Sequence, residues 1–221
     1  MHIEPGIVTG AKIALSYVTA AGVGAAALMQ ARQALRANGL ASLAGRSALT
    51  TAAVFTFFQI LPHAPVGVSE VHLILGSTLF LLFGAAPAAI GLAMGLLLQG
   101  LFFAPSDLPQ YGMNLTTLLV PLFAVQAVAH RIIAPGTAYV DLRYRQALAL
   151  STAYQGGIVA WVAFWAIYGQ GLAGIGGVVT FGAAYMLVIV IEPLVDLAVL
   201  AGAKSLRGLR GSGLVTPRLF A

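Results

Sequence analysis

Long apolar segments separated by short polar stretches dominate the chain. Most of them approach the ~20 residues that an α-helix needs to cross a bilayer, and the third is short enough to tilt or to re-enter the membrane partly. The uncharged stretch 84–88, between the third and fourth segments, predicts a tight helix-to-helix turn. The pattern therefore predicts an all-α, polytopic transmembrane helical bundle of about seven spans, at residues 10–31, 47–62, 72–86, 87–104, 114–131, 146–168 and 177–201.

The basic residues indicate how such a bundle is oriented. The stretches 62–71, 104–113 and 169–176 contain no Lys or Arg. Because short basic loops remain in the cytoplasm, seven spans with the N-terminus outside place every basic cluster inside the cell. We therefore interpret residues 1–221 as one transmembrane domain of the cell inner (cytoplasmic) membrane, with a short cytoplasmic C-terminal tail. The clusters follow the first, fifth and seventh segments and consist of Arg32, Arg36, Arg46, Arg131, Arg143, Arg145, Lys204, Arg207, Arg210 and Arg218.

The composition agrees with a membrane protein. Hydrophobic residues make up 60% of the chain and charged residues 8%, with a mean hydropathy of +0.95, whereas soluble proteins carry about 25% charged residues. The cytoplasmic clusters account for the net charge of +5, so we expect contact with membrane lipid and none with nucleic acid. The chain has no cysteine, so any bound metal must use nitrogen or oxygen ligands.

The first two residues offer a chelating group. No signal-peptide pattern precedes the first span, and His2 is too bulky for the usual removal of methionine, so we expect Met1 to remain. The terminal amine, the His2 amide nitrogen and the His2 imidazole Nδ1 can then close two small rings around one ion. With the amide deprotonated, this planar nitrogen field suits Ni(II) or Cu(II). The alternative is a chance Met-His pair with a solvated histidine.

Histidine is concentrated on one side of the predicted bundle. His2, His63 and His72 all fall on the outer face, whereas His130 lies beside Arg131 at the inner boundary and is interpreted as an interfacial residue. Asn114 begins the fifth span on the same outer face. It is either a helix N-cap or a second-shell residue that orients a ligand histidine.

Carboxylates elsewhere have simpler interpretations. Ser69 and Glu70 are predicted to cap the third helix, with metal contact as the alternative. Asp107 is predicted to belong to a turn. Glu192 and Asp196 lie four residues apart in the last span, where buried carboxylates are costly. We expect them to form a salt bridge with a basic residue such as Arg207, in preference to a role in transport chemistry.

Three stretches of the chain resemble one family. Residues 1–6 (Met-His-Ile-Glu-Pro-Gly) are similar to the Met-His-Ile-x-(Asp/Glu)-Gly-Phe opening of the CbiM/NikM family, the cobalt- and nickel-specific membrane subunits of energy-coupling-factor (ECF) ABC transporters. Residues 63–73 resemble its Asn-Phe-Pro-Val/Ile…Thr-Ser-Gly-His-Leu segment. Residues 99–103 followed by 111–114 resemble its Gln-Ala-Leu-Leu-Phe…Leu-Gly-Ala-Asn pattern. The resemblance covers roughly residues 1–125.

The resemblance implies a set of metal ligands. The family's terminal amine, second-residue amide and imidazole, and second histidine fall on Met1, His2 and His72. His63 stands near the family's Asn-Phe-Pro position, either as a further ligand or as a neighbour of the site. An added imidazole would allow Co(II) or Zn(II) beside Ni(II). Asn114 would orient a ligand.

The same resemblance implies capture of Co²⁺ or Ni²⁺ as cargo, with no enzymatic cofactor, and partners that hydrolyse ATP. The chain has no Gly-x-x-x-x-Gly-Lys-Ser/Thr motif. Coupling would therefore come from an ECF transmembrane protein, ATPase subunits and a small accessory membrane subunit, with residues 22–27 and 84–86 as docking faces or as internal packing. The alternatives are a stand-alone metal carrier and a non-catalytic structural subunit. An intramembrane metalloprotease is disfavoured because His-Glu-x-x-His is absent.

Overall fold

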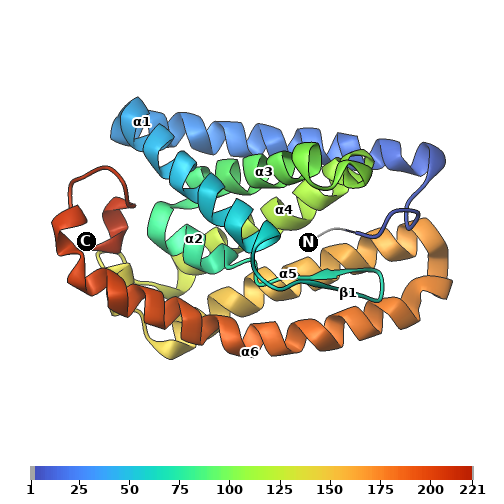
Figure 1. Ribbon diagram of the computed structural model, residues 1–221. Coiled ribbons are helices and arrows are strands. Elements are labelled where there is room, and N and C mark those ends of the chain that lie inside the picture. Colours follow the sequence, from blue (N-terminus) through green and yellow to red (C-terminus); the bar gives the residue numbers. More distant parts are fainter. Residues whose placement is uncertain (1–2, 221) are drawn as a thin grey trace.

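The protein forms an elongated helical bundle with a small β-hairpin packed against its last helix, as Figure 1 shows for the computed structural model. The structure describes residues 3–220. The elements in chain order are α1 (Ile13–Gln59), β1 (Ala64–Val66), β2 (Ser69–Val71), α2 (Gly76–Phe83), α3 (Ala85–Phe102), α4 (Tyr111–Ile132), α5 (Tyr144–Gln170) and α6 (Ile175–Ser205).

Much of the helical part is apolar enough to lie in a membrane. Four helical stretches of the described chain meet the length and hydropathy of a span, namely Gly10–Gln59, Ala85–Phe102, Pro105–Ile132 and Tyr144–Ser205. The predicted class, a mostly helical multi-pass membrane protein, is confirmed. The number of seven crossings and the outside position of the N-terminus stay predictions.

Helix α1 consists of two arms that fold back on each other (Figure 1). The break is at Gly39, where φ is 78° and ψ is 167°, a conformation that only glycine adopts at little cost. The arm after Gly39 packs tightly on α3. A Cβ atom at Gly91 would lie 2.4 Å from Thr50, and the Thr50 hydroxyl donates to the Pro87 carbonyl at 2.7 Å. Small residues thus let these two helices approach closely.

Helix α2 is too short to cross a bilayer alone. Its eight residues rise about 12 Å, against a hydrocarbon core of about 30 Å. The four residues before it are not helical, and Leu75, its N-cap, has a left-handed backbone with φ 56°. The turn into α3 consists of Gly84 alone, with φ 87°, which confirms the predicted tight turn.

The N-terminal segment is attached to the edge of the hairpin by an isolated β-bridge. Ile3 forms an antiparallel bridge with Ser69, and the Glu4 N–H donates to the Val68 carbonyl at 3.2 Å. Sequence reasoning did not predict the hairpin, and it wrongly made Ser69 and Glu70 the cap of the third helix. Both residues lie in β2, five or more positions before α2 begins.

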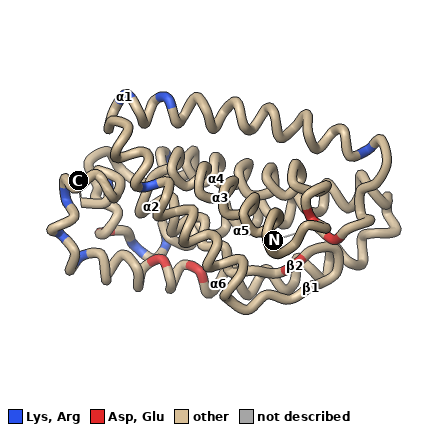
Figure 2. Tube along the Cα trace, turned by 45° about the horizontal axis from the view of Figure 1, so that its top comes forward, with Lys and Arg blue, Asp and Glu red and all other residues tan. Residues whose placement is uncertain are grey.

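The opposite end of the bundle is closed by the C-terminal tail. The Thr216 N–H donates to the Leu82 carbonyl at 2.8 Å, and Arg218 donates to the Ile133 and Ala134 carbonyls. These contacts supply hydrogen-bond donors to carbonyl groups at the C-terminal ends of helices, where the helix itself provides none. Figure 2 shows most of the Lys and Arg positions, coloured blue along the chain trace, toward this end. The predicted orientation, with the basic clusters on the cytoplasmic side, is based on this distribution of charge.

Candidate metal centre

Two histidines meet at the base of the hairpin. The strand register pairs Ala64 with Val71, so the flanking residues His63 and His72 come opposite each other. Their rings stack with centroids 4.9 Å apart and planes 9° from parallel. His72 is buried at 1% exposure, whereas His63 is exposed. The structure therefore brings these two predicted site residues together and places His72 in the interior.

Glu70 contacts the buried histidine directly. Its Oε2 atom lies 2.9 Å from His72 Nε2. Residues two apart in an extended strand face the same side, which explains the contact. A carboxylate at one imidazole nitrogen fixes the orientation of the ring and raises its basicity. Glu70 is thus a candidate site residue, although the sequence favoured a helix cap for it. The signal was the Glu-x-His spacing in an extended segment.

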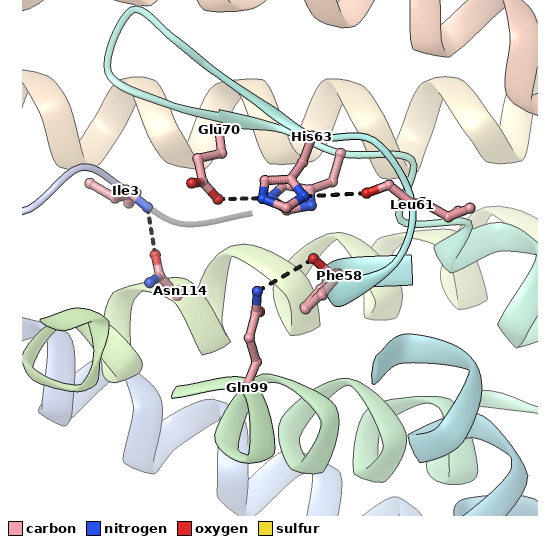
Figure 3. Close-up of polar contacts among 8 residues, drawn as sticks. Ile3, Phe58, Leu61, His63, Glu70, Gln99 and Asn114 are labelled. Atoms are coloured by element: carbon pink, nitrogen blue, oxygen red, sulfur yellow. Dashed lines mark hydrogen bonds and ion pairs between the residues drawn. The ribbon is translucent and has the colours of Figure 1, made fainter. Parts of the chain in front are cut away.

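Asn114 holds the N-terminal segment against the bundle (Figure 3). Its Oδ1 atom accepts the Ile3 N–H at 2.9 Å, and both residues are 1% exposed. The helix N-cap interpretation is wrong, because α4 begins at Tyr111 and its N-cap is Gln110. Asn114 instead fixes the backbone next to His2. Met1 and His2 themselves lie outside the described residues.

The wall behind His72 comes from two other helices. Phe58, at the end of α1, lies with its ring 5.5 Å from that of His72, and its carbonyl accepts a hydrogen bond from Gln99 Nε2 at 3.4 Å. Gln99 and Asn114 belong to the motifs that carry the family resemblance, and both lie at this site (Figure 3). Segments far apart in the sequence therefore converge on one buried imidazole.

The surroundings are acidic. Burial raises the pKa of the Glu4 carboxyl, and the negative charges of Glu70 and Asp107 raise it further. Such mutual effects mark a region of negative potential, which attracts cations. Asp107 lies in a short 3-10 helix, Pro105–Gln110, and its N–H donates to the Ala104 carbonyl at 3.0 Å. This agrees with its predicted place in a turn.

The described side chains do not complete a metal site. Within residues 3–220, no group of three or more His, Asp or Glu side chains is arranged to hold an ion. His72 therefore needs donors from elsewhere. The predicted ones, the amine of Met1 and the two nitrogens of His2, precede the described part of the chain.

The last helix departs from its prediction. The expected salt bridge of Glu192 or Asp196 to Arg207 or another basic residue is wrong, since neither carboxylate has a Lys or Arg partner among residues 3–220. They accept hydrogen bonds from neutral groups instead, Glu192 from Ser151 and Gln155, and Asp196 from Ser77 and Thr78.

Two peripheral predictions concern surfaces. His130 is exposed in the last turn of α4, as expected for an interfacial residue. Of the two small-residue stretches, 84–86 is internal packing, with Ala85 and Ala86 exposed by only 7% and 5%. The other is open, because a Cβ atom at Gly22 or Gly24 would meet nothing within 4 Å.

A bundle of membrane-length helices with a buried histidine beside an anchored N-terminal segment defines a polytopic membrane protein with a candidate ion-binding site. The family model CbiM, the cobalt uptake substrate-specific transmembrane region, matches residues 2–210, and the chain belongs to this family. The protein is accordingly a membrane component of metal uptake, a transport protein and not an enzyme.

Two solved structures share the fold. One, described as a truncated transition metal transporter, is 18% identical with a TM-score of 0.67, covering 93% of this chain and 99% of its own. The other, described as a transition metal transporter, is 17% identical with a TM-score of 0.70, covering 94% of each chain. No curated protein matches the chain.

Proposed function

We propose that the protein is the substrate-capture membrane subunit of an ECF-type importer for Co²⁺ or Ni²⁺. The metal is bound by the Met1 amine, by the His2 amide and imidazole nitrogens, and by His72. Family membership supports the cargo class, and both fold neighbours are described as transition metal transporters. The site lies on the outer face of the membrane in this proposal.

The observation that carries the proposal is the direction of the N-terminal segment. Glu4 contacts Val68 and Ile3 pairs with Ser69, so the segment runs along β2 toward His72 as its residue numbers fall. Two further residues extend at most about 7 Å. The Asn114 contact fixes Ile3 at this starting point. This placement supports a chelate that shares one ion with the buried imidazole.

His63 has a supporting role in the proposal. The lone pairs of an imidazole lie in its ring plane, so two rings stacked 4.9 Å apart and nearly parallel direct their lone pairs side by side and not at one point. Ligation by both rings would require His63 to rotate. We therefore assign His63 to the packing of the His72 ring, and His72 to the ion.

Partner chains supply the energy in this proposal. A coupling membrane protein, ATPase subunits and a small accessory membrane subunit act on the capture subunit, because the 221 residues contain no Walker motif. The open small-residue face at Gly22 and Gly24 suits close helix contact. A stand-alone carrier is the alternative, and it would move the metal down its gradient without ATP.

Metal analysis of detergent-purified protein tests the chelate. The chain with a free Met1 amine is compared with a variant whose N-terminus is extended by a histidine-free tag of several residues, after exposure to Co²⁺ or Ni²⁺ and removal of loose ions. We expect about one ion per chain in the first and loss of tight binding in the second, because the extension removes the free amine beside His2. Equal metal content and affinity in both would refute the ligand set.

A further inference from the structure

A second polar cluster is buried deeper in the bundle, between α2, α5 and α6. Its centre is a pair of carboxylates, Glu192 and Asp196, both 0% exposed. They lie four residues apart and therefore on the same face of α6. Two carboxylates inside a membrane protein are costly unless a cation or protons balance them, and no basic side chain of residues 3–220 does so.

Several oxygen atoms of the cluster are left available. Ser151 and Gln155 donate to the same atom of Glu192, Oε2, each at 2.8 Å. Glu192 Oε1, Gln155 Oε1 and the Tyr154 hydroxyl have no hydrogen-bond partner among the described residues, and all three side chains are 0% exposed. The Tyr154 hydroxyl is also close enough to Glu192 to interact with it electrostatically.

A proline inside α6 adds a carbonyl oxygen. Pro193 has no N–H, so the Ile189 carbonyl four residues earlier loses its helical partner. The Ser151 hydroxyl lies 3.4 Å from this carbonyl and also bonds Glu192. In transporters, carbonyls freed by broken helices coordinate cations. The cluster thus presents carboxylate, amide, carbonyl and hydroxyl oxygens at one place.

The cluster is connected to the candidate metal centre. Tyr185 lies beside the His72 backbone at one side and interacts with Glu192 at the other. From Tyr185 to Asp196, α6 advances about 16 Å along its axis, away from the hairpin. Helix α2, which begins four residues after His72, carries two of the donors to Asp196.

We propose that this cluster is a second, weaker cation site with oxygen ligands only, through which a divalent ion passes after leaving the His72 site. This inference rests on the proposed function. Oxygen ligands hold hard ions such as Mn²⁺, whereas nitrogen donors hold Co²⁺ and Ni²⁺ more tightly. A weaker site deeper in the bundle than the tight one would allow an ion to pass through, since a transported ion must also be released.

Binding of Mn²⁺ by the purified full chain, followed by electron paramagnetic resonance, tests the site. Glu192→Gln keeps the size of the side chain and removes its charge, so we expect Mn²⁺ affinity to fall by at least about 10-fold while tight Co²⁺ binding is unchanged. Asp141→Asn is the matched control, because Asp141 is exposed and pairs only at the surface with Lys204. It should leave both ions bound as before.

Two further variants separate the sites. His72→Ala should lose tight Co²⁺ binding and keep Mn²⁺, whereas Pro193→Ala returns a helical donor to the Ile189 carbonyl and should weaken Mn²⁺ alone. Absence of Mn²⁺ binding in the wild type, or equal Mn²⁺ binding in Glu192→Gln, Pro193→Ala and Asp141→Asn, would overturn this inference. Failure of the wild type to bind Co²⁺ would instead overturn the proposed function.

Discussion

Replacing Asn114 with alanine tests whether the anchored N-terminal segment forms part of the metal centre. The Asn114 side chain accepts the buried Ile3 N–H at 2.9 Å. Alanine leaves that N–H without its acceptor, at a cost of about 1–3 kcal/mol. Because 1.4 kcal/mol corresponds to a factor of ten, docking of the segment should weaken by roughly 5–150-fold. The apparent Kd for Co²⁺ should rise by up to this factor, since only the docked segment binds.

Isothermal titration of the detergent-purified chain with CoCl₂ measures this change. Asn114→Asp retains an acceptor oxygen and should bind more tightly than Asn114→Ala. Asn38→Ala removes an exposed amide on α1 and should match the wild type. Hydrogen exchange at the Ile3 and Glu4 amides should quicken in Asn114→Ala alone. Wild-type Kd and wild-type exchange in that variant would show that other contacts place the segment, and the reasoning would fail.

Four further outcomes are expected. His72→Ala should abolish tight Co²⁺ binding in equilibrium dialysis, whereas the exposed His130→Ala should not, and retained binding in His72→Ala would contradict the ligand assignment. His63→Ala should weaken binding by about 10–100-fold, and complete loss would make His63 a ligand. Gly76→Ala places a carbon atom 2.1 Å from the Tyr154 ring, so it should lower the free energy of unfolding by about 1–3 kcal/mol or more, as followed by thermal melts. Gly156→Ala is the control, because its added carbon meets no atom within 4 Å. Proteoliposomes with this chain alone should bind metal without ATP-stimulated accumulation, and ATP-driven uptake by them would refute the subunit proposal.

The helical architecture was predictable because long apolar runs leave the chain few alternatives in a bilayer. Boundaries were less so. The polar stretch 32–46 was expected to be a loop between the first two spans, yet it is helical except for the break at Gly39. Its Ala, Leu, Gln and Arg residues favour helix, and hydropathy does not register that preference.

The candidate site was predictable in composition and not in geometry. His63 and His72 were assigned to one face. The hairpin that pairs them was not predicted, because its strands have only three residues each, too few for the alternation of apolar and polar residues to be recognised. The salt bridge expected for Asp196 failed for a different reason. Its donors, Ser77 and Thr78, are more than a hundred residues away in sequence, so no local spacing could indicate them.

The contact between Ile3 and Asn114 joins residues 111 positions apart, and this separation sets an order on biosynthesis. Ile3 is made early and finds its place late, because its acceptor lies on α4. At about 5–20 residues per second, Ile3 waits roughly 5–20 s for that helix to be made. A nascent or truncated chain that stops short of α4 lacks this anchor, so metal capture becomes a property of the completed bundle and not of the motif that begins it.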